Sequence, residues 1–170
     1  MTRFLTLTVA ATIAASVAFA QNPFSADAKA NYTGIKNTLL RAADKMPEAD
    51  YSFRTVKEVR TYGEMVGHVA DIQMMLCGMV KGEQPKPVST GKTSKAELAA
   101  ALKASFDYCD TVYNSMDDKA GATTIKMFGR DTTKLGVLNF NIMHDNEMYG
   151  TMVAYLRIKG IVPPSSEGRP

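Results

Sequence analysis

The chain contains no tryptophan, two cysteines and two histidines, and each scarcity limits its chemistry. With 11 methionines and no tryptophan, the apolar residues suit an adaptable helical core, because methionine side chains fill irregular spaces. Any histidine-based site must combine His68 with His144. The net charge of +3 is small, and no basic patch interleaves with aromatic residues, which argues against nucleic acid as a partner.

Beyond the N-terminus, the sequence also lacks an apolar run long enough to cross a membrane. Residues 1–20 combine Arg3, a short apolar stretch and the small-residue pattern Ala18-Phe19-Ala20, which is typical of a cleaved signal peptide. We therefore predict a periplasmic or secreted protein with no stable membrane span, whose mature chain begins at about Gln21. Residues 21–170 then suit one domain with one core.

Four segments carry apolar residues at three- and four-residue spacing, the period of an amphipathic helix. They are residues 25–45, 61–80, 94–116 and 132–160. Capping boxes that begin at Thr61 and Ser94 favour helix starts there, although Thr55 offers a second start for the second helix. No pair of strands is predicted, and residues 117–131 are expected to form an irregular connector. Four such helices predict an all-α four-helix bundle.

The two cysteines bear on the direction of the helices. Cys77 and Cys109 lie at nearly the same distance from Thr61 and Ser94, the expected starts of the second and third helices. If these helices are parallel, the thiols can face each other; if they are antiparallel, the thiols differ in height by roughly 18 Å. A disulfide requires Cα atoms within about 7 Å, and export favours one. We therefore predict a Cys77–Cys109 disulfide and a parallel pair, with two buried free thiols as the alternative.

The last helix places His144 on its apolar stripe, and His68 lies at the edge of the apolar face of the second helix. The stripe is formed by Val137, Phe140, Asn141, His144, Met148, Thr151, Met152 and Tyr155. A histidine in such a position is either buried and hydrogen-bonded or bound to a metal. Both interpretations stay open on spacing alone.

Two segments resemble a known family. GHVADIQ at residues 67–73 and HDNEMYGTMVAYLRIKGIVPPSS at residues 144–166 resemble the DinB/YfiT-like superfamily of metal-dependent four-helix bundles, and the resemblance spans residues 22–166. It implies an up-down-down-up topology with parallel second and third helices. It also implies three metal ligands, one His on the second helix and a His-x-x-x-His pair on the last helix.

His68 and His144 match two of these ligands, and Met148 stands at the third position. The expected ion is a divalent transition metal, zinc or nickel. A thioether suits copper(I) better than zinc, so Met148 is a departure from the pattern. Asp71 and Glu147 each follow a histidine by three residues, and they are candidates either for replacement ligands or for partners that orient the imidazoles.

The function that the resemblance implies is a metal-dependent hydrolase or transferase acting on an unidentified small molecule. No catalytic side chain beyond the ligands is identified, and whether the chain is an enzyme stays open. The alternative is a non-catalytic binding or interaction protein of the cell envelope with a decayed metal site. Some DinB-like proteins use a low-molecular-weight thiol, usually in the cytoplasm, which the export signal argues against. A homodimer is also left open.

Overall fold

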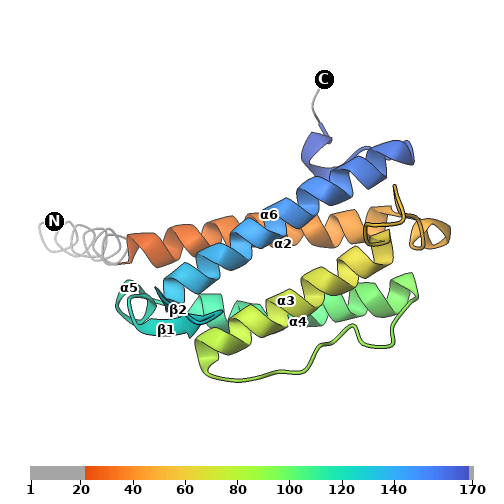
Figure 1. The fold of residues 1–170 in the computed structure, drawn as a ribbon. Helices are drawn as coiled ribbons and strands as arrows, with labels where there is room; N and C mark the ends of the chain where they lie inside the picture. The colour runs from red at the N-terminus through yellow and green to blue at the C-terminus, as the bar shows by residue number, and fades with distance from the viewer. Residues whose placement is uncertain (1–21, 169–170) are drawn as a thin grey trace, which may run out of the picture.

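The computed structural model describes residues 22–168, in which four long helices pack as a bundle (Figure 1). The predicted signal peptide at residues 1–20 lies outside the described residues. The long helices are α2 (Pro23–Lys45), α3 (Tyr62–Lys81), α4 (Lys95–Ser115) and α6 (Lys134–Ile158). Figure 1 shows α2 and α6 running in one direction and α3 and α4 in the other. The predicted four-helix bundle and its up-down-down-up topology are therefore confirmed.

Local side-chain chemistry fixes where three of these helices begin. The Thr61 hydroxyl accepts a hydrogen bond from the Glu64 backbone N–H, and the Glu64 carboxylate accepts one from the Thr61 N–H. Ser94 and Glu97 form the same reciprocal pair before α4. Both pairs satisfy backbone donors that a helix start leaves free, so Thr61 rather than Thr55 marks the start of α3. The Thr133 hydroxyl caps α6 in a similar way.

The parallel pair α3 and α4 is joined covalently. Cys77 and Cys109 form the predicted disulfide, with Cα atoms 5.5 Å apart. Residues 82–94 return the chain along the outside of the pair to the end where α3 began (Figure 1). This crossover lies tightly against α3, because a Cβ at Gly67 would be only 3.0 Å from the Ser89 Cβ.

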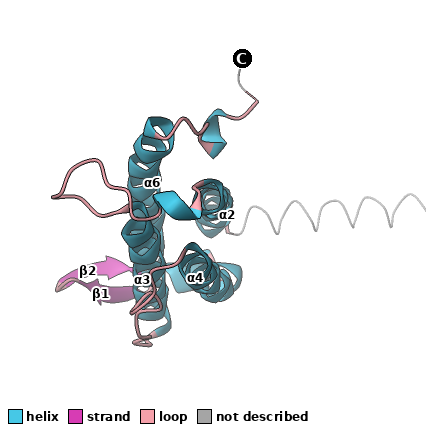
Figure 2. Ribbon diagram, turned by 90° about the vertical axis from the view of Figure 1, so that its right-hand side faces the viewer, coloured by secondary structure: helices cyan, strands magenta, loops and turns pink. Residues whose placement is uncertain are grey.

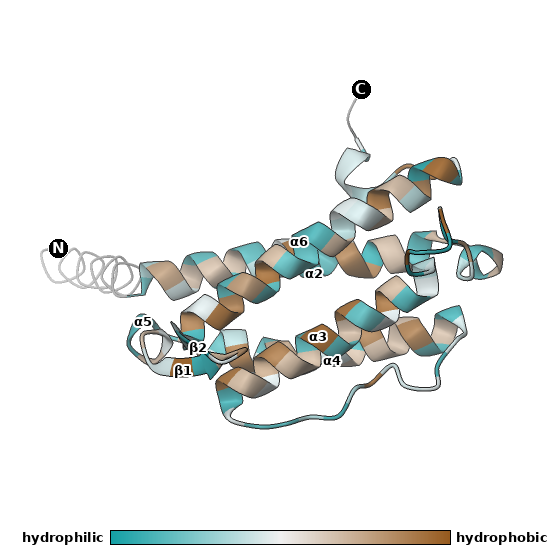
Figure 3. Cartoon of the chain, viewed as in Figure 1, coloured by the Kyte–Doolittle hydropathy of each residue, from teal (hydrophilic) through white to brown (hydrophobic). Residues whose placement is uncertain are grey.

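The core lies along the bundle axis, where the apolar faces of the helices meet (Figure 3). Each helix has two main neighbours, since α2 and α3 each pack against both α4 and α6. Tyrosines provide much of the aromatic volume and bond their hydroxyls inside the bundle. The hydroxyls of Tyr62 and Tyr51 donate to the carbonyls of Ala42 and Ala43, at 2.6 and 2.7 Å. These bonds tie the start of α3 and the connector before it to the end of α2.

The prediction that no strands form was wrong. Within the expected connector, β1 (Thr124–Met127) pairs antiparallel with β2 (Arg130–Thr133), and Figure 2 shows the hairpin on the side of the bundle that α3 and α6 form. Phe128 and Gly129 both have positive φ, the geometry of the tight turns that suit two-residue hairpins. The sequence signal is weak, because β1 alternates polar and apolar residues over only four positions and β2 contains no apolar residue.

Three short helical turns complete the fold: η1 (Glu48–Asp50), α5 (Asp118–Gly121) and η2 (Pro164–Ser166). Across residues 22–168, none of the helices combines the length and apolar character needed to cross a membrane.

Candidate metal centre

The two histidines of the chain meet between α3 and α6. These helices are antiparallel, and the Nε2 atom of His68 lies 3.1 Å from the Nε2 atom of His144. His68 is partly buried, and the His144 side chain is 12% exposed. The predicted convergence of the two rings is therefore present in the structure.

A separation of 3.1 Å is compatible with two arrangements. Two imidazole nitrogens bound to one ion at 2.0–2.1 Å lie about 2.9–3.4 Å apart for bond angles between about 90° and 110°. The same separation suits a direct hydrogen bond, in which one ring donates from Nε2 and the other accepts. Either way, both rings present Nε2 to a shared point.

Asp145 lies on the opposite side of the His144 ring. Its side chain is fully buried, and burial raises the pKa of its carboxyl to about 6. The Oδ1 atom is 3.9 Å from His144 Nδ1, too far for a direct hydrogen bond, and neither atom has a hydrogen-bond partner among the described residues. A carboxylate behind a ligand imidazole keeps the proton on Nδ1 and leaves the Nε2 lone pair free for a metal. The geometry therefore favours Nε2 of His144 as a ligand atom.

A chain of buried amides continues from Asp145 into the core. Gln73 donates its side-chain N–H to Asp145 Oδ2 and accepts a 2.8 Å hydrogen bond from Asn141. The Tyr113 hydroxyl lies 3.3 Å from the Asn141 amide and donates to the carbonyl of Leu138. This chain fixes the carboxylate that faces His144, which makes the centre more rigid than the two rings alone would be.

The sequence did not predict the buried Asp145, because part of the inward face of the last helix was assigned to the wrong residues. The prediction placed His144 and Met148 on the central stripe. The buried stripe consists of Val137, Leu138, Asn141, Asp145, Tyr149, Met152, Tyr155 and Leu156, of which Val137, Asn141, Met152 and Tyr155 were predicted. His144 and Met148 lie at its edge, on the side that faces α3. The helical spacing of Leu138, Asn141 and Asp145 was the signal that could have identified the buried acid.

The other predicted site residues lie in different surroundings. The Asp71 carboxylate accepts hydrogen bonds from the backbone N–H groups of Val88 and Ser89 and from the Ser89 hydroxyl, at 2.6–2.9 Å. Asp71 therefore anchors the crossover. Glu147 is exposed, and Met148 is partly buried against the core. Burial, followed by the positive charges of Arg60 and His144, lowers the pKa of His68, although Asp71 and Glu147 act in the opposite direction.

His68 also lines a cleft of about 420 Å³ between the start of α3, the crossover and the start of α4. The cleft walls are mixed in character and include Glu64, Asp71, Ser89 and Lys92. A small polar molecule in this cleft would have direct access to His68.

The donors present decide which kind of metal centre the chain can build. Two imidazoles fit a transition-metal ion as a pair of ligands. In residues 22–168, no group of three or more His, Cys, Asp or Glu side chains is arranged to hold a metal ion. The described His, Cys, Asp and Glu side chains therefore do not supply a third ligand beside the two imidazoles, whereas a catalytic zinc site normally has three protein ligands.

Solved structures share this architecture at low sequence identity. A DinB-like protein from Bacillus subtilis is 18% identical with a TM-score of 0.67, over 79% of this chain and 92% of its own. A DinB-like protein from Bacillus cereus gives the same identity and TM-score, over 78% and 91%. A mycothiol-dependent maleylpyruvate isomerase is 14% identical with a TM-score of 0.61, over 76% of this chain and 59% of its own. These identities establish similarity of fold alone.

No curated protein matches the chain. The family model of the DinB superfamily matches residues 32–152, which is well over half of the sequence. The matched segment contains both histidines and the greater part of each of the four long helices. The chain therefore belongs to the DinB superfamily.

Proposed function

We propose that this protein binds a transition-metal ion between α3 and α6 through Nε2 of His68 and Nε2 of His144. The observation that carries the proposal is the convergence of these two atoms at 3.1 Å. The orientation of His144 supports it, because the buried Asp145 carboxylate faces the other ring nitrogen.

Zinc and nickel are the divalent ions that an imidazole pair suits, and they are the first ions to test. Binding should be measured on the mature protein by equilibrium dialysis followed by elemental analysis. We expect about one ion per chain in the wild type and at least a tenfold loss of affinity in His68→Ala and in His144→Ala, because either change removes one of two ligands. Asn146→Ala, at an exposed position of the same helix, is the matched control and should bind as the wild type does.

Two results would contradict metal binding by the histidine pair. If the dialysed wild type retains no transition-metal ion, whether zinc, nickel or copper, or if both alanine variants retain as much as the wild type, the histidine pair is not a metal site. The bundle would then be a non-catalytic protein whose two histidines are hydrogen-bonded to each other.

A metal-dependent hydrolase or transferase is the second candidate, and the cleft beside His68 favours it. In that case His68 and His144 hold the ion, Asp145 keeps the His144 proton on Nδ1, and the cleft receives a small-molecule substrate. A bound ion would supply a Lewis acid to that substrate. This function requires a coordination position open to the cleft.

Cobalt(II) substitution tests for that open position, because the visible spectrum reports the ligands of the ion. In an enzyme, added azide should bind the open position and shift the spectrum. A spectrum that azide leaves unchanged would contradict the enzyme and leave the binding protein as the function.

A further inference from the structure

Two methionines lie about one helical turn from the histidine pair, on the side toward the start of α3. Met65 precedes His68 by three residues on α3, and Met148 follows His144 by four residues on α6. Residues three or four apart are neighbours on one helix face, with Cβ atoms about 5–6 Å apart. Each histidine therefore has one methionine beside it on its own helix.

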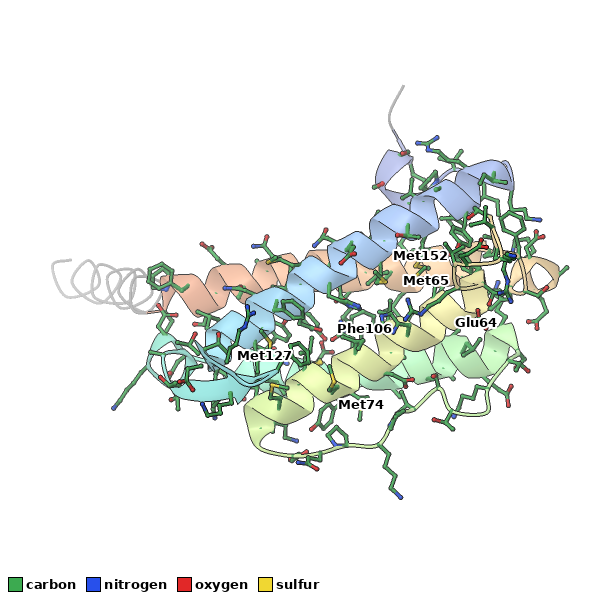
Figure 4. The ribbon with its side chains drawn as sticks, in the orientation of Figure 1. Glu64, Met65, Met74, Phe106, Met127 and Met152 are labelled. Carbon is green, nitrogen blue, oxygen red and sulfur yellow. A yellow bond between two sulfur atoms is a disulfide. The ribbon has the colours of Figure 1, made fainter. Side chains whose placement is uncertain are left out.

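The antiparallel packing brings these two methionines to the same side of the pair. Gln73 bonds Asn141, His68 meets His144, and the Tyr155 hydroxyl donates to the Arg60 carbonyl at 2.7 Å. Residue numbers fall along α3 as they rise along α6, so Met65 lies opposite the turn that carries Met148. Met65 is labelled in Figure 4, in the part of the molecule where the first half of α3 passes the second half of α6.

Burial and charge distinguish this set from an ordinary zinc site. Met65 is 5% exposed, and Met148 is partly buried against the core, so the two methionines lie in a half-buried environment. Two imidazoles and two thioethers carry no negative charge. The one fully buried carboxylate beside them, Asp145, balances a single positive charge. A monovalent ion therefore leaves less uncompensated charge in this half-buried position than a divalent ion does.

We propose that the metal centre of this protein is selective for copper(I), held by His68 and His144 with Met148 and Met65 as soft ligands. Thioethers favour copper(I), whereas zinc and nickel favour nitrogen and oxygen donors, which the structure does not bring to the third position. This inference rests on the proposed metal-binding function and names its ion.

Competition against bathocuproine disulfonate, a coloured copper(I) chelator, measures copper(I) affinity when copper is kept reduced with ascorbate under anaerobic conditions. We expect Met148→Leu to lower copper(I) affinity about tenfold and to change zinc affinity less than about twofold, because leucine keeps the volume and removes the sulfur. Met65→Leu should act in the same direction. Met143→Leu, on the exposed side of α6, is the control and should change neither affinity.

Two further measurements sharpen the test. X-ray absorption of the copper(I) form should show a sulfur shell in the wild type that weakens in Met148→Leu. Met148→His should raise zinc affinity at least about tenfold, because a third imidazole completes a zinc site, and His68→Ala in that background should remove most of the gain.

The results distinguish a failure of the copper(I) proposal from a failure of the proposed metal binding. If the wild type binds zinc through its histidines, but copper(I) shows no sulfur shell and the Met65→Leu/Met148→Leu double variant keeps its copper(I) affinity, the copper proposal is wrong and the metal-binding function stands. If the wild type binds neither ion, both are wrong.

Discussion

Helix α3 has two neighbours of opposite character. Against α4 it runs parallel and is held by the Cys77–Cys109 disulfide and by apolar contacts, and the Asp71 carboxylate beside this interface is fully hydrogen-bonded to the crossover. Against α6 it runs antiparallel and buries a polar row of Gln73, Asn141 and Asp145, with the partly buried His68 and His144 beside it. The buried side-chain atoms that lack a hydrogen-bond partner in residues 22–168 all belong to α6.

The α3–α6 interface therefore costs the fold stability that the α3–α4 interface does not. A buried polar atom without a partner costs about 1–3 kcal/mol, and a buried carboxylate costs more unless it is paired. The α3–α4 interface carries no such cost, whereas the α3–α6 interface carries several in one place. Natural chains break local packing rules mainly at functional sites, which supports the α3–α6 interface as the centre of activity.

Removing the disulfide between α3 and α4 should have the largest effect on stability. The disulfide joins residues separated by 32 positions, and removing it in Cys77→Ala/Cys109→Ala should lower the free energy of unfolding by roughly 3–4 kcal/mol through the entropy of the unfolded chain. Urea denaturation followed by circular dichroism measures this. Reductant should destabilise the wild type and leave the double variant unchanged. Two alkylatable thiols in the unreduced native protein would contradict the bridge.

A substitution of Asp145 at the α3–α6 interface should change metal affinity and stability in opposite directions. Asp145→Asn keeps an acceptor for Gln73 but presents an amide N–H to His144 Nδ1, which favours the tautomer that protonates Nε2. Metal affinity should therefore fall about 10- to 100-fold. Burial holds the pKa of Asp145 at about 6, so at pH 7.5 the neutral amide should raise the free energy of unfolding by about 1–3 kcal/mol.

The exposed pair Lys103 and Asp107 on α4 provides the control for this change. Asp107→Asn removes a carboxylate of the same size from the surface and should alter neither metal affinity nor stability appreciably. A loss of stability in Asp145→Asn without a loss of metal affinity would show that the acid supports the core and not the metal centre.

The helices could be predicted because capping residues and helical spacing depend on a few neighbouring residues. Their direction was indicated by the matched positions of Cys77 and Cys109, which are 32 positions apart, and by the family resemblance. The meeting of His68 and His144 followed from the family resemblance and from the fact that the chain has only these two histidines.

The polar row and the hairpin could not be predicted because their signals are not local. Helical spacing from Leu138 and Asn141 could have placed Asp145 on the inward face, but its partner Gln73 is 72 positions away in the sequence and no local pattern identifies it. The hairpin depends on Phe128 accepting a positive φ, which a bulky residue rarely does. Its ring lies 6.0 Å from that of Phe140, a tertiary contact that no sequence window shows.

Substitution of Asp71 should have the smallest effect on stability of the three changes. It tests whether the crossover contact is independent of the metal centre. By sequence it was a candidate metal ligand or imidazole partner; in the structure its carboxylate accepts three hydrogen bonds from Val88 and Ser89. Asp71→Ala should release the crossover and lower the free energy of unfolding by about 1–2 kcal/mol, because a partly exposed, charge-assisted set of bonds is lost. Limited proteolysis should then cut within residues 82–94 first, since released loops are the preferred sites of cleavage. Metal affinity should change less than about twofold, because hydrogen bonds to the crossover hold both oxygens of the Asp71 carboxylate. A tenfold loss of affinity with an intact crossover would instead make Asp71 part of the metal centre and merge the two interfaces into one functional unit.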